Sequence, residues 1–425
     1  MTEFSAQVYQ NEFLADGATD VHAIVTVTCS GAGQAGQSGA GEAAEIVIVD
    51  TSGSMGLDGI HAAEGAAIAA LDEVLDGTWF AVIAGNHLAR LAYPDVRELG
   101  MARMDTSSRT AARRAIGSFQ PGGGTAMGTW LEMATAVFAA VPAAQRHAIL
   151  LTDGINQHET PDELTRRIAA ASGRFQCDCR GVGADWQVGE LRRIATALMG
   201  TVDLIPTPDQ MAAEFGKLMR ASMGRGVASA DLRVWAPQGA QVLFVRQVAP
   251  AVEDLSSRRR EINALTGAYP TGSWGDESRD FHVAVRVAAP RSVGQEQLAA
   301  RVQLAVGDEI KTQGLVKAKW SDDAELTAQI SPEVAHYTGQ TELAEAIQQG
   351  LAAKAAGDTA TATAKLGRAV QLAAQTGNDE ATSKLRKVVD IEEPGTGKVR
   401  LRRSVDRLDE MALDTASTKT TRVRR

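Results

Sequence analysis

Residues 45–55 read EIVIVDTSGSM, in which a short run of Ile and Val leads to an aspartate and two serines. An apolar run without alternating polar residues is typical of a strand buried on both faces of a parallel sheet. A segment with helical spacing follows at 61–75, and strand-like and helix-like segments then alternate to about residue 223. This alternation predicts a doubly wound α/β fold, in which ligands bind at the carboxyl ends of the parallel strands. Its other predicted strands are 79–85, 146–152, 175–182 and 201–205.

Segments of a different kind lie on both sides of this α/β unit. Residues 3–14 and 21–30 precede it, and the second segment alternates apolar and polar residues as a half-buried antiparallel strand does. More strand segments follow residue 226. We predict an antiparallel β-sandwich whose N-terminal hairpin comes from residues 3–30, so that the α/β unit is inserted into it or flanked by it.

A helical pattern begins after the last strand segment. One tetratricopeptide-like unit can be recognised in this pattern, with Gly350, Ala362 and Ala369 at its small-residue positions. A single unit is not enough to form an independent solenoid. We therefore expect a small helical appendage. The predicted regions are an N-terminal β-hairpin (1–43), the α/β domain (44–226), the β-sandwich (227–325), a helical hairpin region (326–391) and a basic, threonine-rich tail (392–425).

Length and composition restrict the class of protein. The 425 residues are enough for about three domains, and 44% apolar with 22% charged residues is typical of a globular chain. A formal net charge of −9 provides no basic surface for nucleic acid or anionic lipid. Because the N-terminus lacks a signal-peptide pattern and no long apolar run occurs, we predict a cytoplasmic protein without nucleic-acid or membrane partners. Cys29, Cys177 and Cys179 are expected to be buried free thiols.

Two glycine-rich strings resemble nucleotide-binding motifs but lack the required context. Residues 31–36, GAGQAG, match GxGxxG, yet a further glycine-rich stretch and a strand follow where this motif must open a helix. We interpret residues 31–42 as a flexible connection. The string GTGK at 395–398 lacks the earlier glycine and the following Ser or Thr of a phosphate-binding loop.

Three loops of the α/β unit place oxygen atoms at the ends of predicted strands. The loops are VDTSGSMG (49–56), PGGGTAMGT (121–129) and LLTDG (150–154). Their candidate ligands are Asp50, Ser52, Ser54, Thr125 and Asp153. Carboxylate and hydroxyl oxygens without thiol or imidazole form the ligand set that Mg²⁺ prefers. Since loops of this kind can meet at one crevice of the sheet, they predict a single Mg²⁺ (or Mn²⁺) site.

These loops resemble those of a von Willebrand factor type A (VWA) domain with a complete metal-ion-dependent adhesion site (MIDAS). The resemblance covers about residues 44–220 and implies that the five candidate residues bind the cation. It also implies a mostly parallel sheet with one antiparallel edge strand, for which residues 87–93 are the candidate. Because two carboxylates and one divalent cation sum to zero charge, the open coordination position can accept a Glu or Asp side chain of a protein partner.

Binding is favoured over catalysis at this site. Mg²⁺-dependent hydrolysis or phosphoryl transfer normally uses Lys or Arg beside the metal, and residues 50–60, 120–130 and 152–162 contain neither. His61 and His158, the nearest bases, are interpreted as surface residues. We therefore predict a non-enzymatic adaptor, with a Mg²⁺-dependent hydrolase as the less favoured hypothesis. A signalling adaptor and a substrate-recruiting partner of an AAA+ ATPase both remain open.

The C-terminal tail favours the signalling alternative. From residue 415 onward it has four basic and no acidic residues and few large apolar ones, so we expect it to stay solvated. Thr418, Thr420 and Thr421 are candidate phosphorylation sites, with Thr420 favoured, and the alternative is an inert basic terminus. The tail resembles that of actinobacterial proteins of this layout, which implies a Ser/Thr kinase and a forkhead-associated domain protein as partners.

Overall fold

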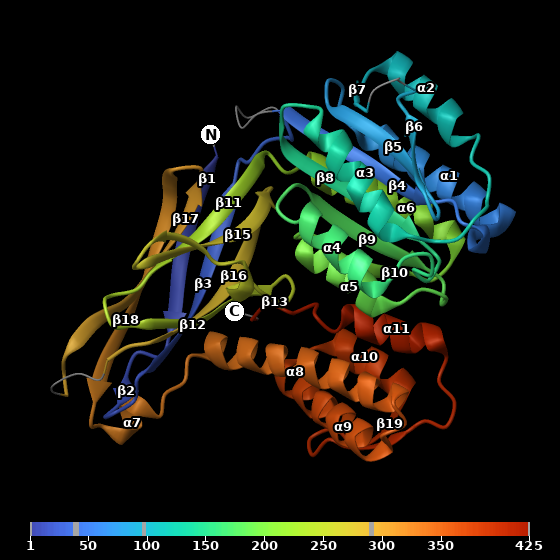
Figure 1. Cartoon of the computed structure of the whole chain (residues 1–425). Helices are drawn as coiled ribbons and strands as arrows, with labels where there is room; N and C mark the ends of the chain where they lie inside the picture. The colour runs from blue at the N-terminus through green and yellow to red at the C-terminus, as the bar shows by residue number, and fades with distance from the viewer. Residues whose placement is uncertain (1, 37–41, 96–98, 289–292, 424–425) are drawn as a thin grey trace. The chain divides into compact units, whose positions relative to one another are not determined.

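The computed structural model of the chain describes residues 2–36, 42–95, 99–288 and 293–423. The chain forms two compact units, coloured along the sequence in Figure 1. The first, the α/β unit, comprises residues 32–228 and 272–275. The second, the sandwich unit, comprises residues 1–31, 229–271 and 276–425. Among the described residues, no helix is long and apolar enough to cross a membrane.

A seven-stranded sheet forms the centre of the α/β unit, with the strand order β10, β9, β8, β4, β5, β6 and with β7 paired to β5. The strands are β4 (Glu42–Asp50), β5 (Trp79–Gly85), β6 (Ala89–Tyr93), β7 (Ala102–Arg103), β8 (Ala143–Thr152), β9 (Gln176–Val182) and β10 (Val202–Ile205). The pairs along β10, β9, β8, β4 and β5 are parallel, whereas β6 and β7 are antiparallel to β5. The antiparallel edge strand predicted within residues 87–93 is therefore β6.

Helices connect these strands and cover the sheet. They are α1 (Gly56–Glu73), α2 (Thr106–Ile116), α3 (Met127–Ala139), α4 (Pro161–Ala171), α5 (Val188–Ala197) and α6 (Met211–Met223). α1, α2 and α6 pack on the sheet face that carries Val47, Val49 and Ile149. β4 and β8 are neighbouring parallel strands, so Asp50 and Thr152 end at the same edge of the sheet.

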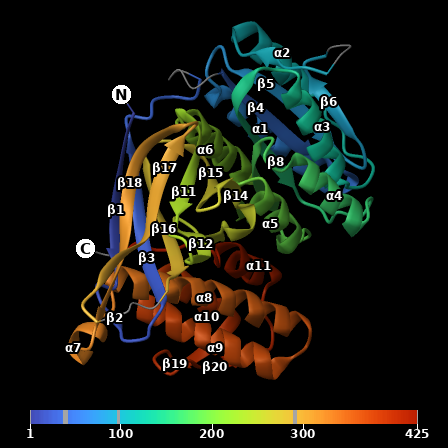
Figure 2. The same ribbon diagram turned by 60° about the vertical axis from the view of Figure 1, so that its left-hand side comes forward.

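Two mainly antiparallel sheets form the sandwich. One has the order β1, β3, β16, β12, β13 and the other the order β14, β15, β11, β17, β18, β2 (Figure 2). Their bounds are β1 (Glu3–Gln10), β2 (Leu14–Ala15), β3 (Asp20–Ser30), β11 (Val227–Trp235), β12 (Gln241–Ala249), β13 (Glu253–Asp254), β14 (Arg260–Asn263), β15 (Thr266–Trp274), β16 (Glu277–Arg286), β17 (Glu296–Val306) and β18 (Glu309–Ser321). A Cβ atom on Gly314 of β18 would overlap Val8 of β1, which shows how closely the sheets pack.

The first of these sheets joins distant parts of the sequence. β3 pairs with β16 along ten positions, from Asp20 opposite Arg286 to Cys29 opposite Glu277. The whole segment that forms the α/β unit lies between these two strands in the sequence. The predicted fold class, a mostly parallel α/β sheet combined with an antiparallel sandwich and C-terminal helices, is confirmed.

Helices complete the sandwich unit. They are α7 (Ala324–Thr327), α8 (Pro332–Ala355), α9 (Thr359–Thr376), α10 (Asp379–Val388) and α11 (Arg407–Ala416), with the hairpin β19 (Val389–Glu393) and β20 (Lys398–Leu401) between the last two. Gly350 of α8 lies so close to Leu366 of α9 that a Cβ atom would fall 2.8 Å from the Leu366 Cγ. Ala362 and Ala369 are fully buried in α9. The small residues of the tetratricopeptide-like pattern therefore lie where the chain is tightly packed.

Two expectations about loosely held segments are wrong. Ala32 and Ala35 are buried, and the Ala35 N–H donates to the Met223 carbonyl at 2.8 Å, so the start of the predicted flexible connection is packed. Its residues 37–41 lie outside the described residues. The tail is not solvated either, because Thr415 and Ser417 are buried and main-chain bonds hold the residues that follow. Composition did not reveal the tail's packing, which combines backbone hydrogen bonds with a few apolar side chains, Met411, Leu413 and Val423.

Candidate metal centre

The first candidate loop connects β4 to α1 through a short 3₁₀ turn, Gly53–Met55. Asp50, the last residue of β4, is fully buried. One of its carboxylate oxygens accepts from the Ser52 N–H at 2.8 Å, and the other accepts from the Thr152 hydroxyl at 2.5 Å. These bonds fix the carboxylate at the sheet edge and orient the loop that follows it.

The three loops meet around one small space beside Gly154. Ser52 Oγ and Ser54 Oγ are 3.0 Å apart, and Ser54 donates to Asp153 Oδ1 at 2.7 Å. A Cβ atom built on Gly154 would lie 3.1 Å from Ser54 Oγ, 3.1 Å from Thr125 Oγ1 and 3.8 Å from Asp50 Oδ2. All five residues predicted as ligands are therefore brought together in the structure.

Backbone bonds tie the glycine-rich loop to its neighbours. The Gly53 N–H donates to the Gly123 carbonyl at 2.9 Å, and the Gly122 N–H donates to the Thr51 carbonyl at 2.9 Å. Asn86, which follows β5, donates its side-chain amide to the Gly122 carbonyl at 3.0 Å. The first and second loops are thus held against each other independently of any ligand.

The electrostatics of this cluster favour a cation. Burial raises the pKa of Asp50 to about 6, although hydrogen bonds from Ser52 and Thr152 oppose that shift. Burial also raises the pKa of Asp153. Both carboxylates are destabilised as anions because no positive group compensates them, and the described residues that line the site include neither Lys nor Arg. A divalent ion fits this donor set, which consists only of carboxylate and hydroxyl oxygens.

The site opens onto a depression of about 790 Å³. His87, His158 and Asp185 line it and are exposed. The two imidazole rings lie 6.1 Å apart, and each would be displaced by a Cβ atom on the adjacent glycine of the Gly123–Gly124 pair. His158 is a surface residue as predicted, and so is His61 on α1.

Sequence reasoning missed two residues at this site. Thr152 holds Asp50 in place, and its only signal was its position directly before Asp153. His87 lies at the mouth and follows β5, and its only signal was its position two residues after that strand. Both residues lie at the carboxyl end of a parallel strand, the edge where ligands of such sheets bind.

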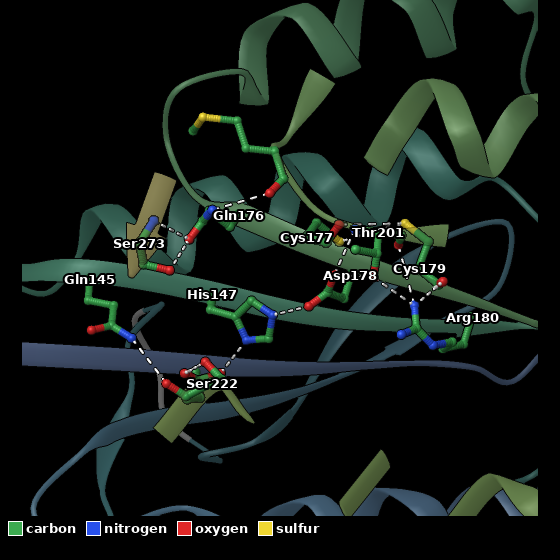
Figure 3. Close-up of polar contacts among 12 residues, drawn as sticks. Gln145, His147, Gln176, Cys177, Asp178, Cys179, Arg180, Thr201, Ser222 and Ser273 are labelled. Atoms are coloured by element: carbon green, nitrogen blue, oxygen red, sulfur yellow. Dashed lines mark hydrogen bonds and ion pairs between the residues drawn. The ribbon is translucent and has the colours of Figure 1, made fainter. Parts of the chain in front are cut away.

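A second polar cluster is buried within the same unit, away from the strand ends (Figure 3). His147 of β8 contacts Glu45 Oε2 at 2.7 Å through Nδ1 and Asp178 Oδ2 at 3.0 Å through Nε2. Ser222 at the end of α6 donates to Glu45 Oε1 at 2.7 Å. The Thr201 hydroxyl and N–H both donate to Asp178 Oδ1, at 2.6 and 2.7 Å. The cluster connects β4, β8 and β9 to α6.

This cluster carries charge. Burial alone would lower the pKa of His147, but the two neighbouring carboxylates outweigh it and raise the pKa to about 9. Burial would likewise raise the pKa of Asp178, yet His147 and the nearby arginines hold it well below its usual value. An imidazolium between two carboxylates is thus the state that the surroundings favour. On the other face of β9, Cys177 and Cys179 are buried and free, as is Cys29, and this confirms the prediction for the cysteines.

Comparisons with known proteins identify the family of this chain. The sequence profile of the von Willebrand factor type A domain matches residues 44–204, and that of the von Willebrand factor type A C-terminal domain matches residues 371–417. A solved structure, von Willebrand factor type A from Catenulispora acidiphila, is 46% identical, with 99% of this chain and 97% of that chain covered and a TM-score of 0.93. The chain belongs to the von Willebrand factor type A family.

Two further relatives are more distant. The structure of the ArnB paralog VWA2 from Sulfolobus acidocaldarius covers 98% of both chains with a TM-score of 0.57, and at 14% identity it shows a shared fold alone. The uncharacterized protein sll0103 of Synechocystis is 28% identical over 216 residues, so the match spans about half the length of that relative and of this chain. VWA domains generally mediate metal-dependent protein–protein interactions and are usually not catalytic.

Proposed function

We propose that this protein is a metal-dependent protein-binding adaptor whose MIDAS holds Mg²⁺ or Mn²⁺. The ligands are Asp50, Ser52, Ser54, Thr125 and Asp153. The observation that carries this proposal is the convergence of three hydroxyls and two carboxylates around Gly154, where any side chain would fill the space. A bound divalent cation supplies a coordination position for an anionic oxygen of the partner.

The residues of the site have different roles in binding the cation and the partner. Asp50 and Asp153 supply the negative charge, and Thr152 and the Ser52 N–H keep Asp50 in one orientation. The depression above them admits a side chain of the partner. The two carboxylates neutralise a divalent ion but leave one of its coordination positions open. A carboxylate oxygen from a Glu or Asp of the partner can fill that position. We propose such an acidic side chain as the ligand.

Binding rather than catalysis is supported by what surrounds the site. Transition states that develop negative charge are normally stabilised by Lys or Arg, and neither occurs among the described lining residues. The imidazoles of His87 and His158 rest on glycine backbone. We therefore propose a non-enzymatic role.

We place this adaptor in cytoplasmic Ser/Thr phosphorylation signalling. Three threonines of the tail, Thr418, Thr420 and Thr421, are the proposed phosphorylation sites, and a Ser/Thr kinase and a forkhead-associated domain protein are the proposed partners. Lys419 and Arg422 beside them support this proposal, since a phosphate would offset their positive charge. Fragment mass spectrometry of protein from its own host tests it, and a tail that is unmodified under all growth conditions would contradict it.

An affinity pull-down with tagged full-length protein tests the adaptor function. We expect a set of partners that is retained with Mg²⁺ and lost with EDTA or in Asp153→Ala. Asp185→Ala is the matched control, because this carboxylate lies at the same mouth but outside the ligand set. If Asp153→Ala retains all metal-dependent partners of the unaltered chain, the proposed site is not the one that binds them.

A further inference from the structure

The last described residues lie on the sandwich unit between α8 and the end of β12, and we call this location the groove. We call residues 418–423 the C-terminal strap. It runs beside the connection between β12 and β13, and Figure 1 shows the chain end there. Val252 N–H donates to the Thr418 carbonyl at 2.7 Å, and Thr420 N–H donates to the Pro250 carbonyl at 3.1 Å. Ala251 and Lys419 form an antiparallel bridge. The strap is therefore bound as an added strand would be.

Threonine hydroxyls contribute to this docking from both sides of the strap. Thr420 Oγ1 donates to the Val248 carbonyl of β12 at 2.6 Å. On the α8 side, Gln340 donates to Thr421 Oγ1 at 3.1 Å, and His336 Nε2 contacts the Thr421 carbonyl at 2.7 Å. The strap thus lies between α8 and the end of β12.

A buried carboxylate receives the arginine of the strap. Asp280 of β16 is only 3% exposed, and its Oδ2 accepts from the Tyr337 hydroxyl at 2.5 Å. Arg422 Nε lies 3.5 Å from the same oxygen, and its guanidinium donates to the Ser278 carbonyl. Asp280 Oδ1 has no hydrogen-bond partner among the described residues. A buried carboxylate needs a compensating cation, and in this groove the strap supplies it.

Thr420 and Asp280 meet at the same place in the sheet. Asp280 is the register partner of Ala249, and Ala249 lies between the two carbonyls, those of Val248 and Pro250, that accept from Thr420. The Thr420 hydroxyl therefore points at a carbonyl oxygen in a part of the groove that already holds a carboxylate. A phosphate on this hydroxyl would face the Val248 carbonyl and add negative charge near Asp280.

We propose that this groove is a binding site for an extended peptide with a threonine and, two residues later, an arginine. The strap is the ligand that the chain itself supplies to this site, and phosphorylation of Thr420 releases the strap. In that step the Oγ1–H bond of Thr420 and the β–γ P–O bond of a nucleoside triphosphate break. An Oγ1–P bond forms, and a proton and a nucleoside diphosphate leave. The phosphate removes the donor to Val248 and adds about −1.5 to −2 charges. This inference rests on the tail phosphorylation proposed above but not on the metal site.

Hydrogen exchange of the full-length chain tests the release. In Thr420→Glu, we expect the main-chain amides of Val252 and of residue 420 to exchange at least about tenfold faster than in the unaltered chain, because the pairing that protects them opens. Lys419→Glu is the control, since it makes a larger change in charge than Thr420→Glu, at an exposed position of the same strap, and should still keep the protection. Arg422→Glu removes the cation beside Asp280 and should release the strap as Thr420→Glu does.

A synthetic peptide with the sequence of residues 415–425 tests the binding site itself. Labelled peptide should bind Thr420→Glu and Arg422→Glu but not the unaltered chain, whose groove is filled, and EDTA should change neither result. Unchanged protection in both variants, or equal peptide binding by variant and unaltered chain, would overturn the inference. Neither hydrogen exchange nor peptide binding depends on the metal, so a negative result in these experiments does not bear on the adaptor function. Whether the tail carries phosphate in the cell is measured separately, by mass spectrometry.

Discussion

Replacement of His147 by leucine is expected to destabilise the α/β unit strongly. His147, Glu45 and Asp178 are each no more than 2% exposed, so the substitution leaves two buried carboxylates without the imidazolium between them. Removal of one partner from a buried ion pair destabilises a protein by about 3–5 kcal/mol. The unit contains about 200 residues, and for that size about 1 kcal/mol shifts the Tm by roughly 2–4 °C. The expected decrease in Tm is therefore about 6–20 °C.

Differential scanning calorimetry of the full-length chain measures this effect. His61→Leu is the control, since it removes an exposed histidine from the same unit and should shift the Tm by less than about 2 °C. Adding Glu45→Gln and Asp178→Asn to His147→Leu should recover at least half of the loss, because no buried charge then remains uncompensated. A His147→Leu protein that melts as the unaltered chain does, or a triple variant no better than the single one, would refute the electrostatic account.

Three further outcomes follow from the same unit. The folded-state pKa of His147 is raised to about 9, so the stabilising contribution of its charge is complete below about pH 6.5 and is lost as the pH rises through 9. The free energy of unfolding, measured by denaturant titration, should therefore fall by about 3 kcal/mol between these two pH values. Gly154→Ala should lower the Mn²⁺ affinity at least about tenfold with little change in Tm, because the methyl group of the alanine fills the space between the candidate ligands. An unchanged affinity, measured by calorimetry, would show that the ion binds elsewhere. Gly85→Ala should lower the free energy of unfolding by about 1–3 kcal/mol, since the new Cβ would overlap the Trp130 ring, and unchanged stability would show that the ring can move.

The α/β fold and the convergence of the three candidate loops could be predicted because their signals are local. The run that ends at Asp50 and the string LLTDG each contain both the strand and the ligand that follows it. In a parallel sheet the carboxyl ends of neighbouring strands share one edge, so separate loops could be assigned to one site without knowledge of their exact pairing. The alternation in residues 21–30 likewise marked a strand of the sandwich, which pairs with β16.

The buried cluster could not be predicted because it depends on register between distant strands. Glu45 is opposite His147 across β4 and β8, although 102 residues separate them in the sequence. A single charged residue in an apolar strand indicates a buried partner but does not say which one. The tail was judged by its side chains, whereas the strap is held largely by backbone groups of residues 250–252 and by Asp280.

The central claim is that Asp50 and the four oxygen donors around it form one divalent-cation site. Calorimetric titration of the full-length chain with Mn²⁺ tests it most directly. We expect one ion per chain for the unaltered protein and for Asp185→Asn, and no measurable binding for Asp50→Asn, which keeps an acceptor for the Ser52 N–H. An Asp50→Asn protein that is folded by circular dichroism and still binds one Mn²⁺ with unchanged affinity would contradict the account.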